Sequence, residues 1–470
     1  MLYHSTRSDL YTVDSAQAVL EGLAPDGGLY MPVSLPAFDW KACLRGSSMD
    51  MSTMILSALL PDIPNMDMLV KKAYTGKFET DHLTPTVSVG DFGVLELFRG
   101  PTSAFKDVAL SMLPQLLTAA KAEKDMEKDI LILTATSGDT GKAALEGFHD
   151  VDGIKICVFY PYGGVSQVQR AQMVTQEGSN VAVCAVYGNF DDCQTGVKNV
   201  FAACREKKLP FALSSANSIN IGRLAPQIMY YFRSYRDLLD AGKITLGEEV
   251  NFSVPTGNFG DILAGYLAKL LGLPVGRLVC ASNANNVLTD FIRTGTYNRL
   301  RPLLKTTSPS MDILVSSNLE RLLYLLSGDT ALVAELMGKL NKEGSYTVPD
   351  DLLEKIQAEF TAYYCDDKRA EEIMGRVYKD YGYLCDPHTA SGWAAAEDYV
   401  RETGDSRAMV VLSTASPYKF PVAVLTAIGG DTSGTEFEQM ARLSAITGVP
   451  VPRNLAGLQG ISAECDQLFK

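Results

Sequence analysis

The chain has 470 residues, of which 46% are hydrophobic, so it can bury a large core divided among two or three domains. Its formal net charge of -13 and sequence pI near 4.9 exclude a surface built to bind nucleic acid or an acidic membrane, because phosphate groups select for an excess of Lys and Arg. An anionic ligand therefore requires a local basic pocket.

Other sequence signals narrow the class of protein. No run of 18 apolar residues occurs, and residues 1–13 lack the basic start and apolar centre of a signal peptide, so we expect a soluble, cytoplasmic protein with no membrane partner. The nine cysteines form no Cys-x-x-Cys pair, which favours buried, reduced thiols. None of the four histidines has a ligand partner at metal-site spacing, so we expect no metal.

Residues 1–85 show helical periodicity in the stretches Ser15–Gly22, Thr53–Leu60 and Asp67–Tyr74. Prolines at positions 32, 36, 61 and 64 interrupt the pattern, and no apolar run typical of a parallel sheet occurs. This part of the chain is predicted to be a helical amino-terminal lobe.

A lysine lies among small and apolar residues where the next helical pattern begins, in Leu97-Phe98-Arg99-Gly100-Pro101-Thr102-Ser103-Ala104-Phe105-Lys106-Asp107. A lysine kept from water loses part of its preference for the ammonium form, so its amine becomes a nucleophile and a base. Lys106 is therefore a candidate Schiff-base lysine. The alternative is an ordinary lysine at a helix start with its charge in solvent.

From residue 94 onward, short apolar runs alternate with amphipathic stretches, which indicates parallel strands joined by helices. The strand candidates are residues 130–135, 154–159, 180–186, 249–254, 277–281 and 408–413. In such sheets the ligand loops lie at the carboxyl ends of the strands. Residues 317–382 are predicted to be helical, with Leu319, Leu322, Leu323 and Leu326 spaced for core packing.

Two glycine-containing loops lie between a predicted strand and a predicted helix. They are Ala135-Thr136-Ser137-Gly138-Asp139-Thr140-Gly141 and Pro255-Thr256-Gly257-Asn258-Phe259-Gly260-Asp261. A helix that starts after such a loop presents free N–H groups and a positive dipole end to an anion. Two such loops suit a ligand with two acidic ends, whereas a glycine after a strand can also be only a tight turn.

Together with these features, the chain resembles the threonine synthase family, whose members are pyridoxal-phosphate enzymes of fold type II related to the tryptophan synthase β subunit. The matching segments are Tyr3-His4-Ser5-Thr6-Arg7, Leu23-Ala24-Pro25-Asp26-Gly27-Gly28-Leu29-Tyr30-Met31-Pro32, the Lys106 segment, Ser137-Gly138-Asp139-Thr140-Gly141, Asn217-Ser218-Ile219-Asn220 with Arg223, the Gly257 loop, and Ser413-Thr414-Ala415-Ser416-Pro417-Tyr418-Lys419-Phe420. They occur in family order and cover nearly the whole chain.

The resemblance implies an α/β fold of the tryptophan synthase β-like type, with parallel sheets and flanking helices in two domains plus the helical amino-terminal lobe. We assign residues 1–85 to the lobe. Residues 86–250 would form the α/β part with the Schiff-base lysine and the substrate carboxylate loop. Residues 251–470 would form the α/β part with the cofactor phosphate loop and a helical insertion. A monomer or a homodimer is expected.

The implied cofactor is pyridoxal 5'-phosphate, joined to Lys106 as the catalytic residue. We assign its phosphate to Gly257, Asn258, Phe259, Gly260 and Asp261, since a glycine loop before a helix lets backbone N–H groups approach. Thr414 resembles the family's hydroxyl at the ring nitrogen, where it would leave that nitrogen essentially neutral. A threonine that merely ends a strand is the alternative.

The implied substrate is O-phosphohomoserine, which loses phosphate from Cγ and gains water at Cβ to give threonine. Lys106 would remove the Cα and Cβ protons and return protons later. The residues assigned to substrate are Ser137, Gly138, Asp139, Thr140, Asn217, Asn220, Arg223 and Lys419. Within this set Asp139 is also a candidate helix cap, and the two asparagines are candidates for an Asx turn.

Lys419 and Arg223 rank first as cations for the substrate phosphate, and each of these two has a solvated or ion-paired side chain as its alternative. Arg99 and Lys142 are further candidates. Arg99 stands where the family pattern has histidine. Ser416 and Tyr418 vary a segment usually written His-Pro-Ala, which leaves the substrate contacts there open.

Two other functions remain as alternatives. A dehydratase or sulfhydrylase of the same fold usually lacks the Asp26-Gly27-Gly28-Leu29 segment and carries Asn at the position of Asp139. A catalytically silent homologue that binds phosphorylated ligands is the second alternative. The joint presence of Lys106, both loops and Thr414 argues against it.

Overall fold

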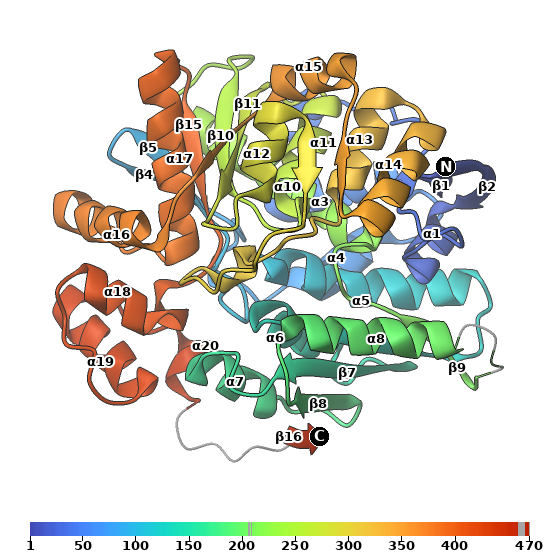
Figure 1. The fold of residues 1–470 in the computed structure, drawn as a ribbon, viewed down its shortest axis with the longest axis horizontal. Coiled ribbons are helices and arrows are strands. Elements are labelled where there is room, and N and C mark those ends of the chain that lie inside the picture. Colours follow the sequence, from blue (N-terminus) through green and yellow to red (C-terminus); the bar gives the residue numbers. More distant parts are fainter. Residues whose placement is uncertain (205–206, 208, 459–465, 470) are drawn as a thin grey trace.

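The structure, a computed structural model, describes residues 1–204, 207, 209–458 and 466–469, so Cys465 lies outside the described residues. Two sheets form its centre, one of six strands in the upper half of Figure 1 and one of five strands at the bottom. Helices surround both sheets in this view. The arrangement confirms the expected α/β fold with parallel sheets and flanking helices.

The six-stranded sheet has the order β14-β11-β10-β15-β5-β4, and its neighbours are parallel except for the hairpin of β4 and β5. Its strands are β4 (Thr86–Val89), β5 (Phe92–Glu96), β10 (Val250–Pro255), β11 (Val275–Ser282), β14 (Phe360–Tyr364) and β15 (Met409–Ser413). Every residue of β10 and β15 is buried, as expected for central strands of a parallel sheet that is covered on both faces.

The five-stranded sheet has the order β16-β8-β7-β6-β9 and is parallel throughout. Its strands are β6 (Asp129–Ala135), β7 (Ile154–Pro161), β8 (Val181–Val186), β9 (Phe211–Ser214) and β16 (Asp466–Phe469). All six strands predicted from apolar runs are therefore confirmed, as β6, β7, β8, β10, β11 and β15.

The predicted helical segment 317–382 is helical over most of its length but contains two strands. Its helices are α13 (Leu319–Ser327), α14 (Thr330–Glu343), α15 (Asp350–Glu359) and α16 (Asp367–Tyr381). Its strands are β14 and β13 (Ser345–Thr347), the second of which pairs with β12 (Thr296–Asn298). The prediction was wrong for β14, because pairing with β11 rather than local pattern decides its conformation. Leu319, Leu322 and Leu323 are buried in the core as predicted.

The two sheets draw their strands from both sides of the proposed boundary at residue 250. β4 and β5 precede that boundary but pair within the six-stranded sheet, and β16 joins the five-stranded sheet from near the carboxyl terminus. The division into residues 86–250 and 251–470 stays a prediction about domains.

The amino-terminal region contains the predicted helices together with a small sheet that the sequence did not indicate. Its helices are α1 (Ser15–Glu21), α2 (Trp40–Cys43), α3 (Ser48–Leu59) and α4 (Met66–Tyr74). The sheet is antiparallel with order β2-β1-β3, from β1 (Leu2–Ser5), β2 (Ser8–Asp14) and β3 (Tyr30–Pro32).

The remaining helices connect and cover the sheets. They are α5 (Lys106–Glu123), α6 (Asp139–Phe148), α7 (Gln167–Val174), α8 (Phe190–Cys204), α9 (Ile221–Leu224), α10 (Ile228–Asp240), α11 (Gly260–Leu270), α12 (Val287–Thr294), α17 (Pro387–Thr403), α18 (Pro421–Ala427), α19 (Glu436–Thr447) and α20 (Arg453–Ala456), with 3-10 turns η1 (Ala225–Gln227), η2 (Pro309–Met311) and η3 (Pro417–Lys419). No helix in the described residues is long and apolar enough to cross a membrane.

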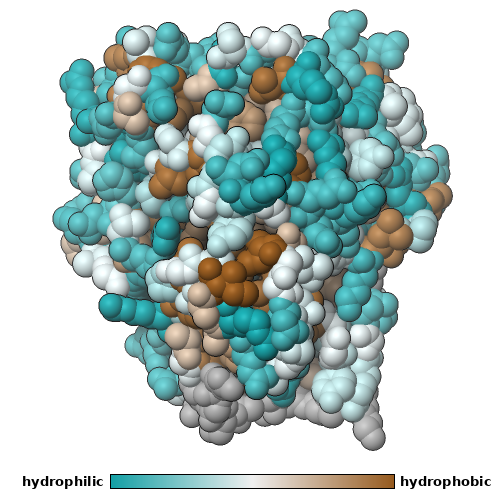
Figure 2. Space-filling model, turned by 90° about the vertical axis from the view of Figure 1, so that its left-hand side faces the viewer, coloured by the Kyte–Doolittle hydropathy of each residue, from teal (hydrophilic) through white to brown (hydrophobic). Residues whose placement is uncertain are grey.

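Figure 2 shows the side of the molecule that lies at the left in Figure 1. This face is mostly hydrophilic, and the most compact of its apolar groups lies near its centre. The eight cysteines that the structure describes are free thiols, six of them buried. Within the same residues, no group of three or more His, Cys, Asp or Glu side chains is arranged to hold a metal ion.

Candidate active site

One cavity of about 1370 Å³ brings most of the predicted site residues together. It lies at the carboxyl ends of β6, β10 and β15, where parallel sheets of α/β proteins bind ligands. The predicted residues that line it are Lys106, Ser137, Thr140, Asn217, Arg223, Gly257, Asn258, Phe259, Gly260, Asp261 and Thr414. The predicted residues that do not line it are Gly138, Asp139, Asn220 and Lys419.

Lys106 is the first residue of α5, and the turn before it is held by the carboxylate of Asp107. That carboxylate accepts hydrogen bonds from the N–H of Thr102 at 2.9 Å and from the Thr102 hydroxyl. Lys106 is only 8% exposed. Burial lowers the pKa of its amine to about 8, although the nearby charge of Asp139 acts in the opposite direction. The amine therefore becomes neutral and nucleophilic at a lower pH than an ordinary lysine.

Asp139 and Lys419 form a buried ion pair beside Lys106. The Lys419 Nζ lies 2.6 Å from Oδ1 of Asp139, and Oδ2 of Asp139 lies 4.0 Å from the Lys106 Nζ. Burial would raise the pKa of the Asp139 carboxyl, but the charges of Lys419 and Lys106 outweigh burial and hold that pKa below its usual range. Lys419 also donates to the carbonyl of Thr102 at 3.2 Å and is fully buried. This placement argues against the expected contact between Lys419 and a substrate phosphate.

The Gly257 loop joins β10 to α11 as predicted. Phe259 has a φ of 62°, in the left-handed region, and α11 begins at the next residue. A Cβ at Gly257 would lie 2.7 Å from the backbone oxygen of Ser310, so only glycine permits this close approach. The hydroxyl of Ser316 donates to the Gly257 carbonyl at 2.6 Å. The loop is thus braced from outside and directs the positive end of α11 toward the cavity.

Arg223 and Asp261 carry buried polar atoms that have no hydrogen-bond partner within the described part of the chain. These atoms are Nε and Nη1 of Arg223 and Oδ2 of Asp261. Oδ1 of Asp261 accepts from the hydroxyls of Tyr230 at 2.5 Å and Tyr231 at 3.1 Å. Burial lowers the pKa of the Arg223 guanidinium to about 10 and raises the pKa of the Asp261 carboxyl to about 6. Unpartnered donors on a buried cation are costly, so Arg223 fits an anionic ligand.

Thr136 organises the loop that precedes α6. Its hydroxyl accepts from the N–H groups of Gly138 and Gly141, both at 2.9 Å. Those two N–H groups are therefore engaged within the loop and cannot serve an anion at the same time. Of the four loop residues assigned to the substrate, Ser137 and Thr140 line the cavity. These two residues are therefore the candidates in this loop for binding a substrate carboxylate.

Asn217 and Asn220 have different places in the structure. Asn217 lines the cavity. Asn220 is fully buried and caps α9, because its side chain accepts from the N–H of Gly222 and donates to the carbonyl of Val19, both at 2.8 Å. Of the two roles predicted for Asn220, the turn-building role is the one that the structure shows.

Thr414 directly follows β15 and is 5% exposed at the cavity. Its carbonyl accepts from the N–H of Phe105 at 2.8 Å, and Ala104 forms an isolated bridge with Ala415. These contacts fix the segment that carries Thr414 against the segment that carries Lys106. A hydroxyl at this place can donate or accept a hydrogen bond.

The two lower-ranked cations are ion-paired elsewhere and do not line the cavity. Arg99 donates to Glu96 at 2.7 and 2.9 Å and to Glu79 at 3.0 Å. Lys142 lies 3.1 Å from Glu146 one helical turn away. The structure thus places both side chains in ion pairs away from the cavity.

The departures from the family pattern at Ser416 and Tyr418 concern the turn η3, which ends at Lys419. The Ser416 hydroxyl accepts from the N–H of Tyr418 at 3.4 Å and caps this turn. The buried Tyr418 donates its hydroxyl to the carbonyl of Val449. Both residues stabilise the turn and its packing, and neither lines the cavity.

Two residues that the sequence analysis did not select, Ser310 and His388, also line the cavity, and Asp386 contacts the second of them. The Ser310 hydroxyl accepts from the Lys106 Nζ at 3.4 Å, and the Ser310 N–H donates to Nε2 of His388 at 3.2 Å. Nδ1 of His388 lies 2.6 Å from a carboxylate oxygen of Asp386. Asp386 and Pro387 mark a recognisable helix start, but no local signal indicates that the histidine after them lines the cavity and contacts Ser310.

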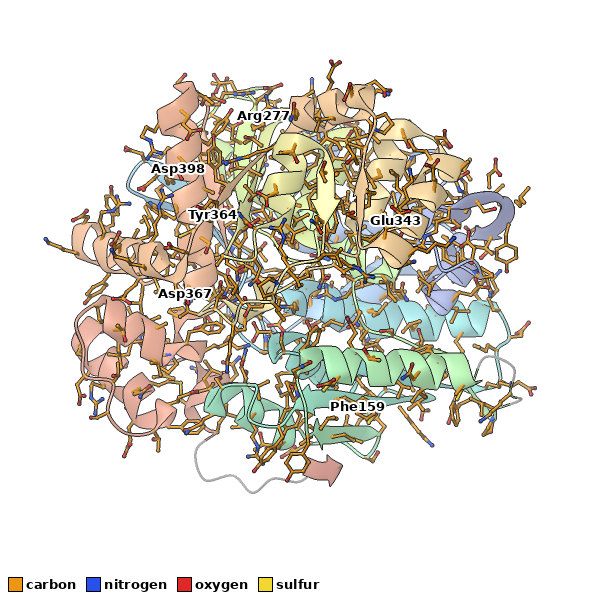
Figure 3. All side chains as sticks on the ribbon, viewed as in Figure 1. Phe159, Arg277, Glu343, Tyr364, Asp367 and Asp398 are labelled. Carbon is orange, nitrogen blue, oxygen red and sulfur yellow. The ribbon has the colours of Figure 1, made fainter. Side chains whose placement is uncertain are left out.

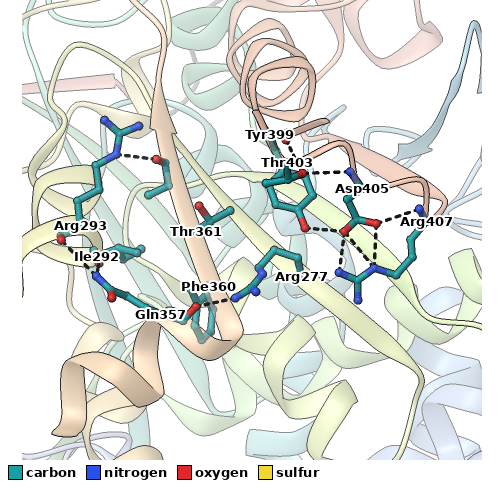
Figure 4. A pocket seen from close by; sticks show the side chains of 11 residues that line it. Arg277, Ile292, Arg293, Gln357, Phe360, Thr361, Tyr399, Thr403, Asp405 and Arg407 are labelled. Carbon is teal, nitrogen blue, oxygen red and sulfur yellow. Dashed lines mark hydrogen bonds and ion pairs between the residues drawn. The ribbon is translucent and has the colours of Figure 1, made fainter. Parts of the chain in front are cut away.

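A second cavity, of about 550 Å³, lies near the amino ends of β11, β14 and β15 (Figure 4). Arg277 donates to the carbonyls of Gln357 and Ala358, both at 2.6 Å, and Arg407 pairs with Asp405 at 2.6 Å. Its polar side chains are thus largely engaged with one another. None of the predicted site residues lines this cavity, so the larger cavity is the candidate active site.

Three known sequence families match this chain, and two of the matched ranges overlap. Residues 92–414 match the family described as "Pyridoxal-phosphate dependent enzyme". Residues 2–74 match "Threonine synthase N terminus", and residues 389–467 match "Threonine synthase, C-terminal".

Curated relatives match over most of the chain. "Threonine synthase" of Pseudomonas aeruginosa is 41% identical over 434 residues, which cover 90% of this chain and 90% of the relative. "Threonine synthase" of Saccharomyces cerevisiae is 37% identical over 464 residues, with coverages of 91% and 89%. "Threonine synthase-like 1" of Homo sapiens is 36% identical over 457 residues, which cover 93% of this chain and 61% of the relative. The chain therefore spans less than two thirds of the length of that relative.

Solved structures agree with these matches. The PLP-bound threonine synthase from Brucella melitensis superposes with a TM-score of 0.87 at 37% identity, covering 100% of this chain and 96% of the other. Threonine synthase from yeast superposes with a TM-score of 0.88 at 34% identity, with coverages of 100% and 95%.

Proposed function

The chain belongs to the threonine synthase family of pyridoxal-phosphate-dependent enzymes, and we propose that it converts O-phospho-L-homoserine and water into L-threonine and phosphate. One observation carries the proposal. A buried amine, that of Lys106, shares a cavity with the buried guanidinium of Arg223, whose Nε and Nη1 have no hydrogen-bond partner in the described structure. A phosphorylated amino acid is a ligand that both groups can serve.

The cofactor is pyridoxal 5'-phosphate, and the described cavity fits it. The cofactor carries an aldehyde and a phosphate, which match a nucleophilic lysine and a glycine loop at a helix start. When bound, it supplies an aldehyde for covalent bonding to an amine and a ring that withdraws electrons from the adjacent carbon. We assign its phosphate to Gly257–Asp261 and its ring nitrogen to the Thr414 hydroxyl.

Lys106 is the base and acid of the proposed reaction. The bond from Cγ to the phosphate oxygen breaks, protons leave Cα and Cβ, and the hydroxyl of water is added at Cβ. Protons return to Cα and Cγ, and the remaining proton of the water goes to the released phosphate, so that atoms balance between O-phosphohomoserine with water and threonine with phosphate. Because burial brings the pKa of the Lys106 amine to about 8, this group can both accept and donate a proton near neutral pH.

The substrate is held at its two acidic ends. Ser137 and Thr140 face the cavity and would bind the substrate carboxylate, with Asn217 beside them. Arg223 also lines the cavity and would bind the substrate phosphate. Lys419 and Asp139 act from behind the cavity wall, through the charge that Asp139 presents to Lys106. The cytoplasmic location and the monomeric or homodimeric state stay predictions.

The experiment that tests the proposal measures products from three substrates with the purified protein. O-phosphohomoserine should give phosphate and threonine in equal amounts, whereas serine and O-acetylhomoserine should give far less product. Release of pyruvate from serine, or sulfide-dependent product from O-acetylhomoserine, at a higher rate would favour a dehydratase or sulfhydrylase. Absence of turnover with all three, together with retained phosphate binding, would favour a silent homologue.

A further inference from the structure

We propose that Ser310 is a positioning residue for the Lys106 amine and that His388 holds Ser310 in place. The inference rests on the proposed function, in which the free amine of Lys106 moves protons at the substrate. In this role, a hydrogen bond from the Lys106 amine to the Ser310 hydroxyl holds the amine between proton transfers. Neither Ser310 nor His388 belongs to the loops assigned above to the cofactor or the substrate.

Ser310 is the one hydrogen-bond acceptor of the Lys106 amine within the described residues, at 3.4 Å. The carboxylate of Asp139 is farther away, at 4.0 Å, and the ring of Phe105 lies 4.7 Å from the same nitrogen. A neutral amine has two N–H groups and one lone pair. When one N–H is directed at the Ser310 hydroxyl, the lone pair is left for a proton acceptor role on another side of the nitrogen.

Ser310 belongs to the segment 306–312, and a buried polar network holds this segment in place. Asp312 accepts from the side chains of Asn283 at 2.8 Å and Asn285 at 2.9 Å, and from the Thr306 hydroxyl at 2.7 Å. The two asparagines are 1% and 6% exposed. Because these groups satisfy one another, the segment does not need Lys106 to keep its position.

The same segment is tied down a second time through its neighbour Thr307. Asp367, at the start of α16, accepts from the N–H of Thr307 at 3.1 Å and from its hydroxyl at 3.0 Å. Figure 3 labels Asp367 where α16 begins, beside the loop that crosses toward the centre of the molecule. The ends of the segment are therefore fixed, and the orientation of its tip at Ser310 depends on local contacts.

His388 supplies the contact that orients this tip. Its Nδ1 donates to Asp386 at 2.6 Å, which leaves the lone pair of Nε2 to accept the Ser310 N–H at 3.2 Å. Asp386 is fully buried and also accepts from the N–H of Thr389 at 3.1 Å, so it caps α17. These contacts hold the Asp386 carboxylate in place, and its hydrogen bond to Nδ1 therefore restricts rotation of the imidazole. The ring of Phe420 packs edge-on against the imidazole at 5.1 Å. His388 is thus rigid, and it holds the Ser310 backbone rather than touching the amine.

The test uses four variants. They are Ser310→Ala, His388→Leu, the double variant that combines these two changes, and His388→Gln. Leucine removes the Nε2 acceptor, whereas the side-chain oxygen of glutamine can accept from the Ser310 N–H at a similar reach. Ser391→Ala is the matched control, because this buried hydroxyl of the same helix α17 donates to the carbonyl of Pro387 at 3.1 Å rather than to Ser310, His388 or Lys106. Circular dichroism and melting temperatures establish that each variant is folded.

The first readout is the rate at which cofactor-free protein captures pyridoxal phosphate covalently, followed by absorbance. Ser310→Ala and His388→Leu should each slow capture by roughly 10-fold, the value of one lost hydrogen bond, and the double variant should be no slower than either. His388→Gln should recover most of the loss, and Ser391→Ala should match the parent. In turnover, the first two variants should lower kcat with little change in KM.

Three results would overturn the proposal. They are a capture rate for Ser310→Ala equal to that of the parent, additive losses in the double variant, and equal losses in the leucine and glutamine variants. The capture experiment does not use O-phosphohomoserine. If the parent makes no threonine while the capture rates follow the expected order, the proposed function fails and the positioning role stands.

Discussion

Lys419 and Asp139 form an ion pair at 2.6 Å with both side chains removed from solvent, and Asp139 lies 4.0 Å from Lys106 on its other side. The sequence suggested Lys419 as a cation for substrate. In the structure it is instead the counter-ion that keeps Asp139 ionised. Asp139 in turn places a negative charge beside the Lys106 amine, and this charge opposes the effect of burial on the Lys106 pKa.

Loss of this pair should destabilise the protein. Lys419→Met leaves the Asp139 carboxylate buried without its nearest partner, at a cost of about 3–5 kcal/mol. The midpoint of urea denaturation should fall accordingly. Lys368→Met is the control, because the side chain of Lys368 is 88% exposed and lies 4.0 Å from Glu372, so its midpoint should match the parent. Equal midpoints for both variants would show that the buried pair contributes no net stability.

The covalent capture of pyridoxal phosphate by cofactor-free protein should depend on pH with a midpoint near the Lys106 pKa of about 8. Below that pH the amine is protonated and does not attack; above it the neutral amine reacts, and the rate levels off. Free N-acetyl-lysine, measured under the same conditions, corrects for titration of the aldehyde. Asp139→Asn removes a charge that raises this pKa, so its midpoint should move to lower pH. A midpoint above that of the parent would contradict the account.

Arg223→Met should weaken phosphate inhibition of the reaction by roughly 10- to 100-fold, because a charge-assisted contact to phosphate contributes about 1.5–3 kcal/mol. Its affinity for pyridoxal phosphate should change much less. Arg99→Met is the matched control, because the Arg99 guanidinium donates to Glu96 and Glu79. This variant should leave phosphate inhibition unchanged. A larger loss for pyridoxal phosphate than for inorganic phosphate would assign Arg223 to the cofactor instead.

Thr414→Val keeps the shape of the side chain but removes its hydroxyl, so kcat should fall by roughly 10-fold, the effect of one hydrogen bond. Thr414→Ser should retain most of the activity. Thr414→Asp would favour the protonated ring nitrogen through its charge and should also lower threonine formation. The absorbance spectrum of the bound cofactor should change in the Val and Asp variants and not in Ser. Identical spectra in all three would move the contact with the ring nitrogen to another residue.

The features that local sequence could predict are those set by local chemistry. The Lys106 segment and the Gly257 loop are strand-to-helix or helix-start patterns, and the structure places both at one cavity. The fate of Lys419 was not predictable, because its partner Asp139 is 280 positions earlier in the chain and joins it only through the fold. β14 was missed for a similar reason, since its pairing with β11 decides its conformation.

The contact between Ser310 and His388 belongs to the same class. Ser310 lies in a short 3-10 turn whose only local signal is Pro309 at its start, and His388 is 78 residues away. Asp386 before Pro387 marks a helix start in the sequence. Its hydrogen bond to the imidazole of His388 could not be predicted from helix propensities. Polar contacts between distant loops therefore require the three-dimensional structure.

The most direct measurement of the central claim is a single turnover experiment with O-phosphohomoserine in water enriched in oxygen-18. The account requires cleavage of the bond between Cγ and oxygen and addition of water at Cβ. It therefore predicts threonine that contains one heavy oxygen and phosphate that contains none. Heavy oxygen in the phosphate, with homoserine as the second product, would mean that water attacks phosphorus and would contradict the proposed reaction.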